Sequence, residues 1–226
     1  MRFAICFYTL FALLAAPSFS EEKRIEPGSR QLSEEELKIH ESFQKKETSE
    51  KNELRVLEYY PPVVYDTDIH NFSAISVLGD YVVLEDGSGW KIRPGYESEA
   101  FSWKEFDPIV ITENDSVVSS WFHGYNFKMT NLNTNKYIET KLFLGPLLDN
   151  PNTLQVVSID PYYKEVGLSD NSFWKVDSSD FYLLDKWLIG DGIIIGRNYR
   201  KRWHSTSDKI LINVNLLKTV KCHRVQ

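Results

Sequence analysis

Hydrophobic and polar positions alternate in short runs from about residue 75 onward, which is the pattern of half-buried β-strands. Residues 81–84 and 90–92 are rich in β-branched and aromatic residues, and the run Asp86-Gly87-Ser88-Gly89 between them is a turn sequence. These runs predict a β-hairpin. Turn signals recur about every 8 to 15 residues, the spacing of a small sandwich or barrel. Further strands are expected at 106–112, 125–130 and 137–144.

The same pattern occurs twice in the chain. When the sequence is shifted by 84 positions without a gap, 13 of 51 residues are identical. Average residue usage would give roughly three identities in such a window, so the match indicates a duplication. The matched pairs are Val82 with Val166, Leu84 with Leu168, Asp86 with Asp170, Ser88 with Ser172, Trp90 with Trp174, Lys91 with Lys175, Trp103 with Trp187, Asp107 with Asp191, Ile109 with Ile193, Ile111 with Ile195, Asn114 with Asn198, Asn131 with Asn215 and Leu132 with Leu216.

The boundary between the copies falls at 145–151, where turn formers and β-breakers cluster. We expect one β-domain at 71–147 and the other at 155–226. A single core is marginal in a domain of about 70 residues. The sequence therefore predicts a mainly β protein in which two diverged copies of a small β-barrel or sandwich domain pack together, with approximate two-fold symmetry.

Two tryptophans per copy are expected to form the structural core. Trp90 and Trp174 lie in the predicted hairpins, and Trp103 and Trp187 follow 13 residues later, far enough away to belong to another element. Aromatic side chains bury about 150 to 250 Å² each, so a small domain gains much of its stability from them.

Residues 1–20 have the organisation of a cleaved signal peptide. Arg2 is followed by an uncharged apolar stretch at 3–16 and by small residues at 17–20. The apolar stretch is shorter than the about 20 residues that span a membrane, and charged residues follow it directly. We therefore expect an exported protein, periplasmic or secreted, with no membrane span after signal cleavage.

A charged arm is expected at 21–70. Residues 21–58 hold eleven Glu and eight Lys or Arg, with apolar residues too sparse for a continuous stripe. Ser33 followed by Glu36 has capping-box spacing, which predicts a helix beginning there. The arm is therefore interpreted as helical or disordered.

Charge and motif content exclude several classes of function. The formal charge is -6 and becomes -7 when Arg2 is removed with the signal peptide, so no basic stripe for nucleic acid is expected. The five histidines lack metal-ligand spacing, and no motif indicates a cofactor.

Cys222 is the only cysteine after residue 20, which leaves no intramolecular disulfide. It is expected to be a half-buried bystander.

Asp86, Asp107, Asp170 and Asp191 allow two interpretations. Aspartates in turns usually accept hydrogen bonds from nearby backbone N–H groups. They could instead form the paired acid and base groups of a hydrolase that acts on envelope polymers. The first interpretation is favoured, because no third group supports catalysis, and no catalytic residue is assigned.

Two loops that differ between the copies are the candidate binding sites. Exposed aromatic side chains and arginines are favoured at recognition surfaces. Alternatively, Trp121 and Trp203 cover an open end of each domain core. The candidate binding residues are Trp121, His123 and Tyr125 in the first copy and Arg200, Arg202, Trp203 and His204 in the second.

The segment from Leu168 to Lys175, with Trp187, Gly190-Asp191 and Ile193 to Ile195, resembles a short β-domain of exported bacterial proteins, including those of chlamydia-like organisms. The resemblance covers residues 75–226, and the first copy departs from it with Phe106 in place of Gly190. It implies export but no activity and no site. The function expected is a non-enzymatic binding or structural module of the periplasm, envelope or secreted fraction, whose partner is an envelope or host protein or glycan.

Overall fold

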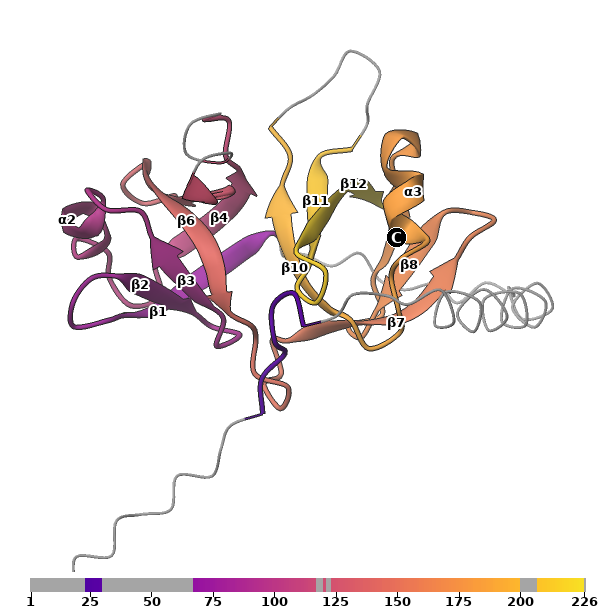
Figure 1. Ribbon diagram of the computed structural model, residues 1–226, viewed down its shortest axis with the longest axis horizontal. Helices are drawn as coiled ribbons and strands as arrows, with labels where there is room; N and C mark the ends of the chain where they lie inside the picture. Colours follow the sequence, from indigo (N-terminus) through magenta and orange to yellow (C-terminus); the bar gives the residue numbers. More distant parts are fainter. Residues whose placement is uncertain (1–22, 30–66, 117–119, 121–122, 200–206, 226) are drawn as a thin grey trace, which may run out of the picture.

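The structure is a computed structural model that describes residues 23–29, 67–116, 120, 123–199 and 207–225. Two closed antiparallel barrels of six strands each lie side by side (Figure 1). The prediction of two tandem β-domains packed together is confirmed, and each domain is a barrel. The helix predicted from Ser33 lies outside the described residues.

The first barrel closes when β1 pairs with β4, after the order β1-β2-β3-β6-β5-β4. The predicted hairpin is present as β2 and β3. One short helix, α2 (Glu97–Ala100), precedes β4. The strands are β1 (Ile69–Ile75), β2 (Tyr81–Leu84), β3 (Gly89–Ile92), β4 (Pro108–Glu113), β5 (Phe127–Asn131) and β6 (Lys136–Leu144).

The second barrel repeats this plan and closes when β7 pairs with β10. A 3-10 turn, η2 (Ser178–Asp180), and the helix α3 (Phe181–Leu184) precede β10. Among the described residues, no helix reaches the length and apolarity needed to span a bilayer. The strands are β7 (Leu154–Asp160), β8 (Glu165–Leu168), β9 (Phe173–Val176), β10 (Gly192–Arg197), β11 (Lys209–Asn213) and β12 (Lys218–Arg224).

Residues 84 positions apart are structurally equivalent only as far as β4 in the first barrel and β10 in the second. Ile109 pairs with Asn131, and its equivalent Ile193 pairs with Asn213, so the loop after β10 is two residues shorter than the loop after β4. The predicted match of Asn131 with Asn215 is therefore wrong, and that of Leu132 with Leu216 fails for the same reason. An ungapped comparison cannot register a deletion within a loop.

All four tryptophans expected in the core are buried. Trp90, Trp174 and Trp187 have no exposed surface, and 5% of Trp103 is exposed. In the first barrel, the ring of Trp90 meets that of Phe127 edge-on, with centroids 5.4 Å apart. Such pairs add to the free energy gained from burial alone.

The turn before Asp107 and Asp191 requires a left-handed backbone. Phe106 has φ of 67° and Gly190 has φ of 89°. Glycine adopts this region freely, whereas a phenylalanine is strained there. The two copies thus have different residues at this position but the same left-handed backbone. This is the position at which the first copy departs from the motif of the exported bacterial proteins.

The barrels meet along strands that are buried on both faces. β10 and β11 alternate between two cores: Ile193 and Ile195 lie in the second barrel, whereas Ile194 and Ile212 pack against the core of the first. Strands buried on both sides read as continuous apolar runs. The apolar sequence at 193–195 is unbroken because each face of β10 packs against a different core. A strand that had only one buried face would alternate apolar and polar residues.

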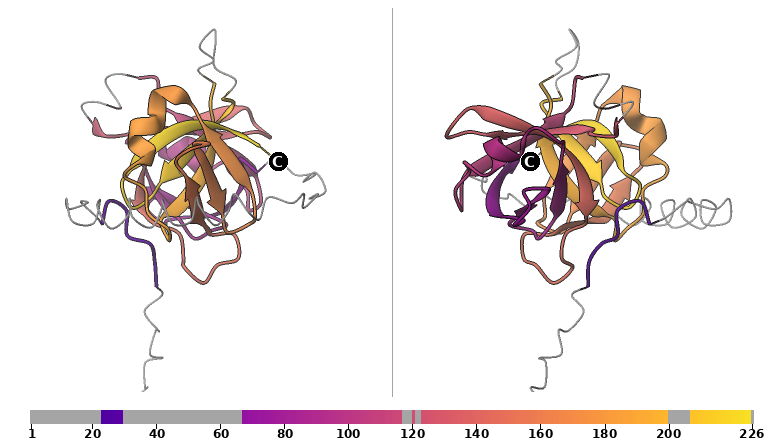
Figure 2. Two further views of the ribbon diagram at one scale, coloured as in Figure 1. Left: turned by 90° about the vertical axis from the view of Figure 1, so that its right-hand side faces the viewer. Right: turned by 60° about the vertical axis from the view of Figure 1, so that its left-hand side comes forward.

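Residues 23–29, which fall within the predicted arm at 21–70, lie against both barrels and end in a turn. They are drawn in indigo in Figures 1 and 2. Ile25 is buried and belongs to the same core as Trp90. The first barrel itself begins at Ile69, inside the range assigned to the arm.

Candidate functional site

The equivalent strands β4 and β10 meet at the seam between the barrels. They run parallel and pair at Thr112 and Arg197, near the end of each strand. Because the strands run in the same direction there, the β4–β5 and β10–β11 connections start next to each other. In Figure 1 the ends of β4 and β10, from which these connections start, lie on the same side of the molecule.

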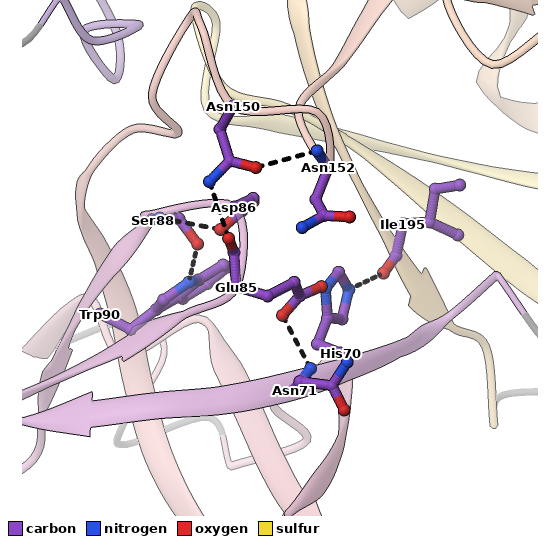
Figure 3. Close-up of polar contacts among 9 residues, drawn as sticks. All are labelled: His70, Asn71, Glu85, Asp86, Ser88, Trp90, Asn150, Asn152 and Ile195. Carbon is purple, nitrogen blue, oxygen red and sulfur yellow. Dashed lines mark hydrogen bonds and ion pairs between the residues drawn. The ribbon is translucent and has the colours of Figure 1, made fainter. Parts of the chain in front are cut away.

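His70 of β1 makes a polar contact across this seam (Figure 3). Its Nδ1 lies 2.9 Å from Glu85 Oε1, and its Nε2 lies 2.7 Å from the carbonyl oxygen of Ile195 in the second barrel. An ionised carboxylate and a carbonyl oxygen only accept hydrogen bonds, so both ring nitrogens must donate. His70 is therefore held as an imidazolium that joins the two barrels.

The surroundings of His70 favour its charged form. Burial by itself lowers the pKa of His70, but the hydrogen bond and charge of Glu85, the charge of Asp86 and the Ile195 carbonyl outweigh burial and raise the pKa to about 9. Burial also raises the pKa of Asp86, against the effects of the nearby His70 charge and the hydrogen bonds from Ser88. Glu85 is further fixed by the backbone N–H of Asn71, which lies 2.7 Å from Oε2.

The stability of the protein should therefore depend on pH through His70. The folded-state pKa of about 9 exceeds the ordinary value of 6.5, so the stabilisation is complete below about pH 6.5 and is lost as the pH rises through 9. The loss should be on the order of 3 kcal/mol. Urea denaturation at a series of pH values measures it. His70→Gln, which cannot titrate, should lack this part of the pH dependence, and equal slopes for the two proteins would contradict the assignment.

Asp68 makes a second polar contact across the seam. Its fully buried carboxylate accepts hydrogen bonds from Arg197 Nε and Lys209 Nζ, each at 2.6 Å. Arg197 ends β10 and Lys209 begins β11, so one carboxylate of the first barrel binds two cations of the second. The hydrogen bond from Arg197 raises the pKa of that guanidinium.

A groove of about 730 Å³ opens at the junction of the barrels. Its first wall is formed by the end of β4, the described residues of the β4–β5 connection and the start of β5. Its second wall is formed by η2, α3 and the start of β12. Thr219 Oγ1 donates to Glu113 Oε1 at 2.7 Å and joins the two walls. A smaller hollow of about 140 Å³ lies between Tyr137 and Tyr199 and is also lined by Glu113.

The structure places only two of the seven predicted binding residues. His123 is exposed, whereas Tyr125 is buried and its ring lies under the Lys141 ammonium, 5.2 Å from the nitrogen. Asn114 Nδ2 donates to the Tyr125 carbonyl at 2.8 Å, so the residue belongs to the base of the loop. The others lie outside the described residues: Trp121, Arg200, Arg202, Trp203 and His204.

The turn aspartates of the two hairpins have equivalent structural contacts. Asp86 Oδ1 accepts from the Ser88 backbone N–H at 2.8 Å, and Ser88 Oγ accepts from Trp90 Nε1 at 2.9 Å. In the second barrel the corresponding distances are 3.0 Å to Asp170 and 2.7 Å from Trp174. The repeated Asp-x-Ser-x-Trp sequence thus binds the one polar atom of a buried indole.

Asp107 and Asp191 also hold their own turns. The backbone N–H of Lys104 and the side-chain amides of Asn131 and Asn133 donate to Asp107 and lower its pKa. Asp191 Oδ2 accepts from Asn213 Nδ2 at 2.8 Å. All four aspartates are therefore engaged in turn contacts, and this geometry gives the hydrolase hypothesis no support.

Cys222 is fully buried in the second barrel, deeper than the half-buried position expected. Burial raises the pKa of its thiol well above the ordinary value, which keeps the side chain protonated and unreactive. Within the described parts of the chain, no group of three or more His, Cys, Asp or Glu residues is placed to hold a metal ion.

The seam residues His70, Glu85 and Asp68 were missed by the sequence analysis. A signal existed, because the shift of 84 places His70 opposite Leu154 and Asp68 opposite Asn152. The strand register agrees: His70 pairs with Ile109, and Leu154 pairs with the equivalent Ile193. Ionisable residues that occur in only one copy mark contacts that the repeated fold does not need.

The fold and the seam define a class of protein: a tandem pair of six-stranded barrels joined by buried polar contacts. No protein-family model, curated protein or solved structure matches the chain. The resemblance to exported bacterial proteins stays a prediction.

Proposed function

We propose that the protein is an exported, non-enzymatic binding module whose binding surface is the groove between the two barrels. The observation that carries the proposal is the groove of about 730 Å³, which both barrels line. The connection between β4 and β5, one of the two that differ between the copies, lines it. Loops and clefts on a rigid β scaffold are the usual place for binding residues.

The chemistry of the groove favours a protein or glycan partner over nucleic acid. Its lining holds three carboxylates, those of Glu113, Asp115 and Asp180, and two ammonium groups, those of Lys218 and Lys221. A nucleic-acid site requires an excess of cations to neutralise phosphates. Mixed polar groups beside an exposed aromatic ring are instead typical of protein and glycan recognition.

Tyr182 and Lys218 are the side chains of the lining best placed to meet a partner. Tyr182 is 64% exposed, and Lys218 is exposed at the start of β12. A tyrosine on a groove wall offers a large flat surface and a hydroxyl at a small cost in conformational entropy. The predicted export places the partner in the envelope or on a host.

The test compares three forms of the mature protein immobilised on beads and exposed to labelled envelope extract. Tyr182→Ala with Lys218→Ala should weaken capture of the species held by the wild type at least about tenfold, the effect of losing about 1.4 kcal/mol. The control, Tyr162→Ala with Lys91→Ala, changes an exposed tyrosine and an exposed lysine outside the groove and should capture as well as the wild type.

Circular dichroism checks that each variant is folded. Equal capture by all three proteins, or no specific capture by the wild type, would contradict the proposal. Protease or periodate treatment of the extract distinguishes a protein partner from a glycan. Arg202→Ala with Trp203→Ala tests separately whether the loop residues predicted from the sequence contribute.

A further inference from the structure

Residues 23–29, here called the N-terminal clasp, bind the body of the protein, the first three of them as an extended strand. Arg24 forms an antiparallel bridge with Leu147 in the connection between the barrels. The backbone N–H of Ile25 donates to the Pro146 carbonyl, and that of Leu148 donates to the Lys23 carbonyl, each at 3.0 Å. This is the hydrogen bonding of a peptide added to an exposed backbone edge.

The two side chains that follow Lys23 anchor the clasp. Arg24 Nη1 donates to the Gly87 carbonyl at 2.6 Å, which ties the clasp to the β2–β3 turn of the first barrel. Ile25 is only 5% exposed and belongs to the hydrophobic cluster at the seam. A charge-assisted hydrogen bond beside a buried aliphatic side chain gives both affinity and sequence preference.

The far end of the clasp reaches the second barrel. Glu26 to Ser29 form a turn in which the Ser29 N–H donates to the Glu26 carbonyl and Gly28 has φ of 65°. The Gly28 N–H donates to the carbonyl of Val214, just after β11, at 2.9 Å. The seven residues therefore contact both barrels and the connection between them.

Gly145 and Gly192 have no side chain, and this makes room for the clasp. A Cβ atom on Gly145 would lie 1.6 Å from the carbonyl oxygen of Ile25, and one on Gly192 would lie 2.5 Å from Ile25 Cδ1. Neither glycine has a positive φ, so the backbone conformation does not require them. The first barrel has Pro108 at the position equivalent to Gly192, so the repeated fold does not require a glycine there either.

From these contacts we infer that the surface around residues 145–148, Gly192 and Val214 is a peptide-binding site for an extended segment with arginine followed by an aliphatic residue, and that the clasp is its intramolecular ligand. Thirty-seven residues separate Ser29 from Thr67, so the clasp binds as a ligand on a long tether. Its docking holds the two barrels together. This inference does not depend on whether the groove of about 730 Å³ binds a partner.

The experiment cuts the tether of the mature chain. A specific protease site is inserted between residues 48 and 49, the purified protein is cleaved, and the products are separated by gel filtration. The fragment that carries the clasp should remain bound to the two-barrel body. A labelled peptide with the sequence of residues 21–30 should then exchange with it, as measured by fluorescence anisotropy.

Substitutions in the clasp test its specificity. Ile25→Ala or Arg24→Ala should weaken retention of the fragment at least about tenfold, because the first removes a buried apolar side chain and the second removes the hydrogen bond to the Gly87 carbonyl. Glu26→Ala is the matched control, since this side chain is exposed, and it should leave retention unchanged. Separation of the wild-type fragments would overturn the inference, as would equal retention of the Ile25→Ala and Glu26→Ala fragments.

Discussion

Trp174→Ala should lower the free energy of unfolding by about 3 to 5 kcal/mol, and Trp90→Ala should do the same in the first barrel. Both indoles are fully buried, so truncation leaves a cavity that the barrel wall cannot close. The oxygen atoms of the Ser88 and Ser172 hydroxyls also lose the hydrogen bond that they accept from the indole N–H, which adds to the cost.

Guanidinium denaturation, monitored by circular dichroism, measures this effect. Trp174→Phe keeps much of the apolar volume but loses the indole N–H, so its loss should be smaller than that of the alanine variant. Tyr162→Ala is the exposed control, because 76% of this side chain is open to solvent, and it should change stability by about 1 kcal/mol or less. A midpoint of unfolding unchanged by Trp174→Ala would contradict a packing role.

Asp68→Asn should cost about 3 to 5 kcal/mol, although the side chains are nearly the same size. The carboxylate is fully buried and binds Arg197 and Lys209 of the other barrel. Removing its charge ends the attraction in both ion pairs while the side chain stays buried, so that attraction no longer offsets the cost of desolvation. Asp149→Asn, an exposed change in the connection between the barrels, is the matched control and should have little effect.

A double-mutant cycle separates the Asp68 contact from general damage. Lys209→Met removes one of the two cations, so the loss caused by Asp68→Asn should be smaller in that background than in the wild type. Additive losses would show that Asp68 and Lys209 are not coupled. Because the ion pairs are largely buried, salt should reduce the effect only slightly.

The duplication was predictable because its evidence is local. The Asp-x-Ser-x-Trp sequence fixes a turn, a buried indole and the hydrogen bond between them within five residues, and it occurs in both copies. The apolar runs at 109–111 and 193–195 likewise show strands that must be buried. Tryptophans and alternating β-branched residues have few other roles in a small β-domain.

The seam could not be predicted in the same way. His70 contacts Ile195 over 125 residues of sequence, and Asp68 contacts Lys209 over 141. Nothing in the neighbourhood of either residue indicates its partner. The clasp is a similar case, since Arg24-Ile25 lies in a charged stretch that resembles an arm by composition and yet is held by groups in both barrels.

The amino-acid sequence alone thus determined the strands, the hairpin turns, the repeated core and the boundary between the copies. These features depend on short-range hydrogen bonds and side-chain alternation, which leave few other conformations. How the barrels meet was decided in three dimensions. Water is excluded from His70, Asp68 and Ile25 only when distant segments of the chain come together. The charge on His70, the burial of Asp68 and the docking of Ile25 therefore depend on neighbours in space and not on neighbours in the chain.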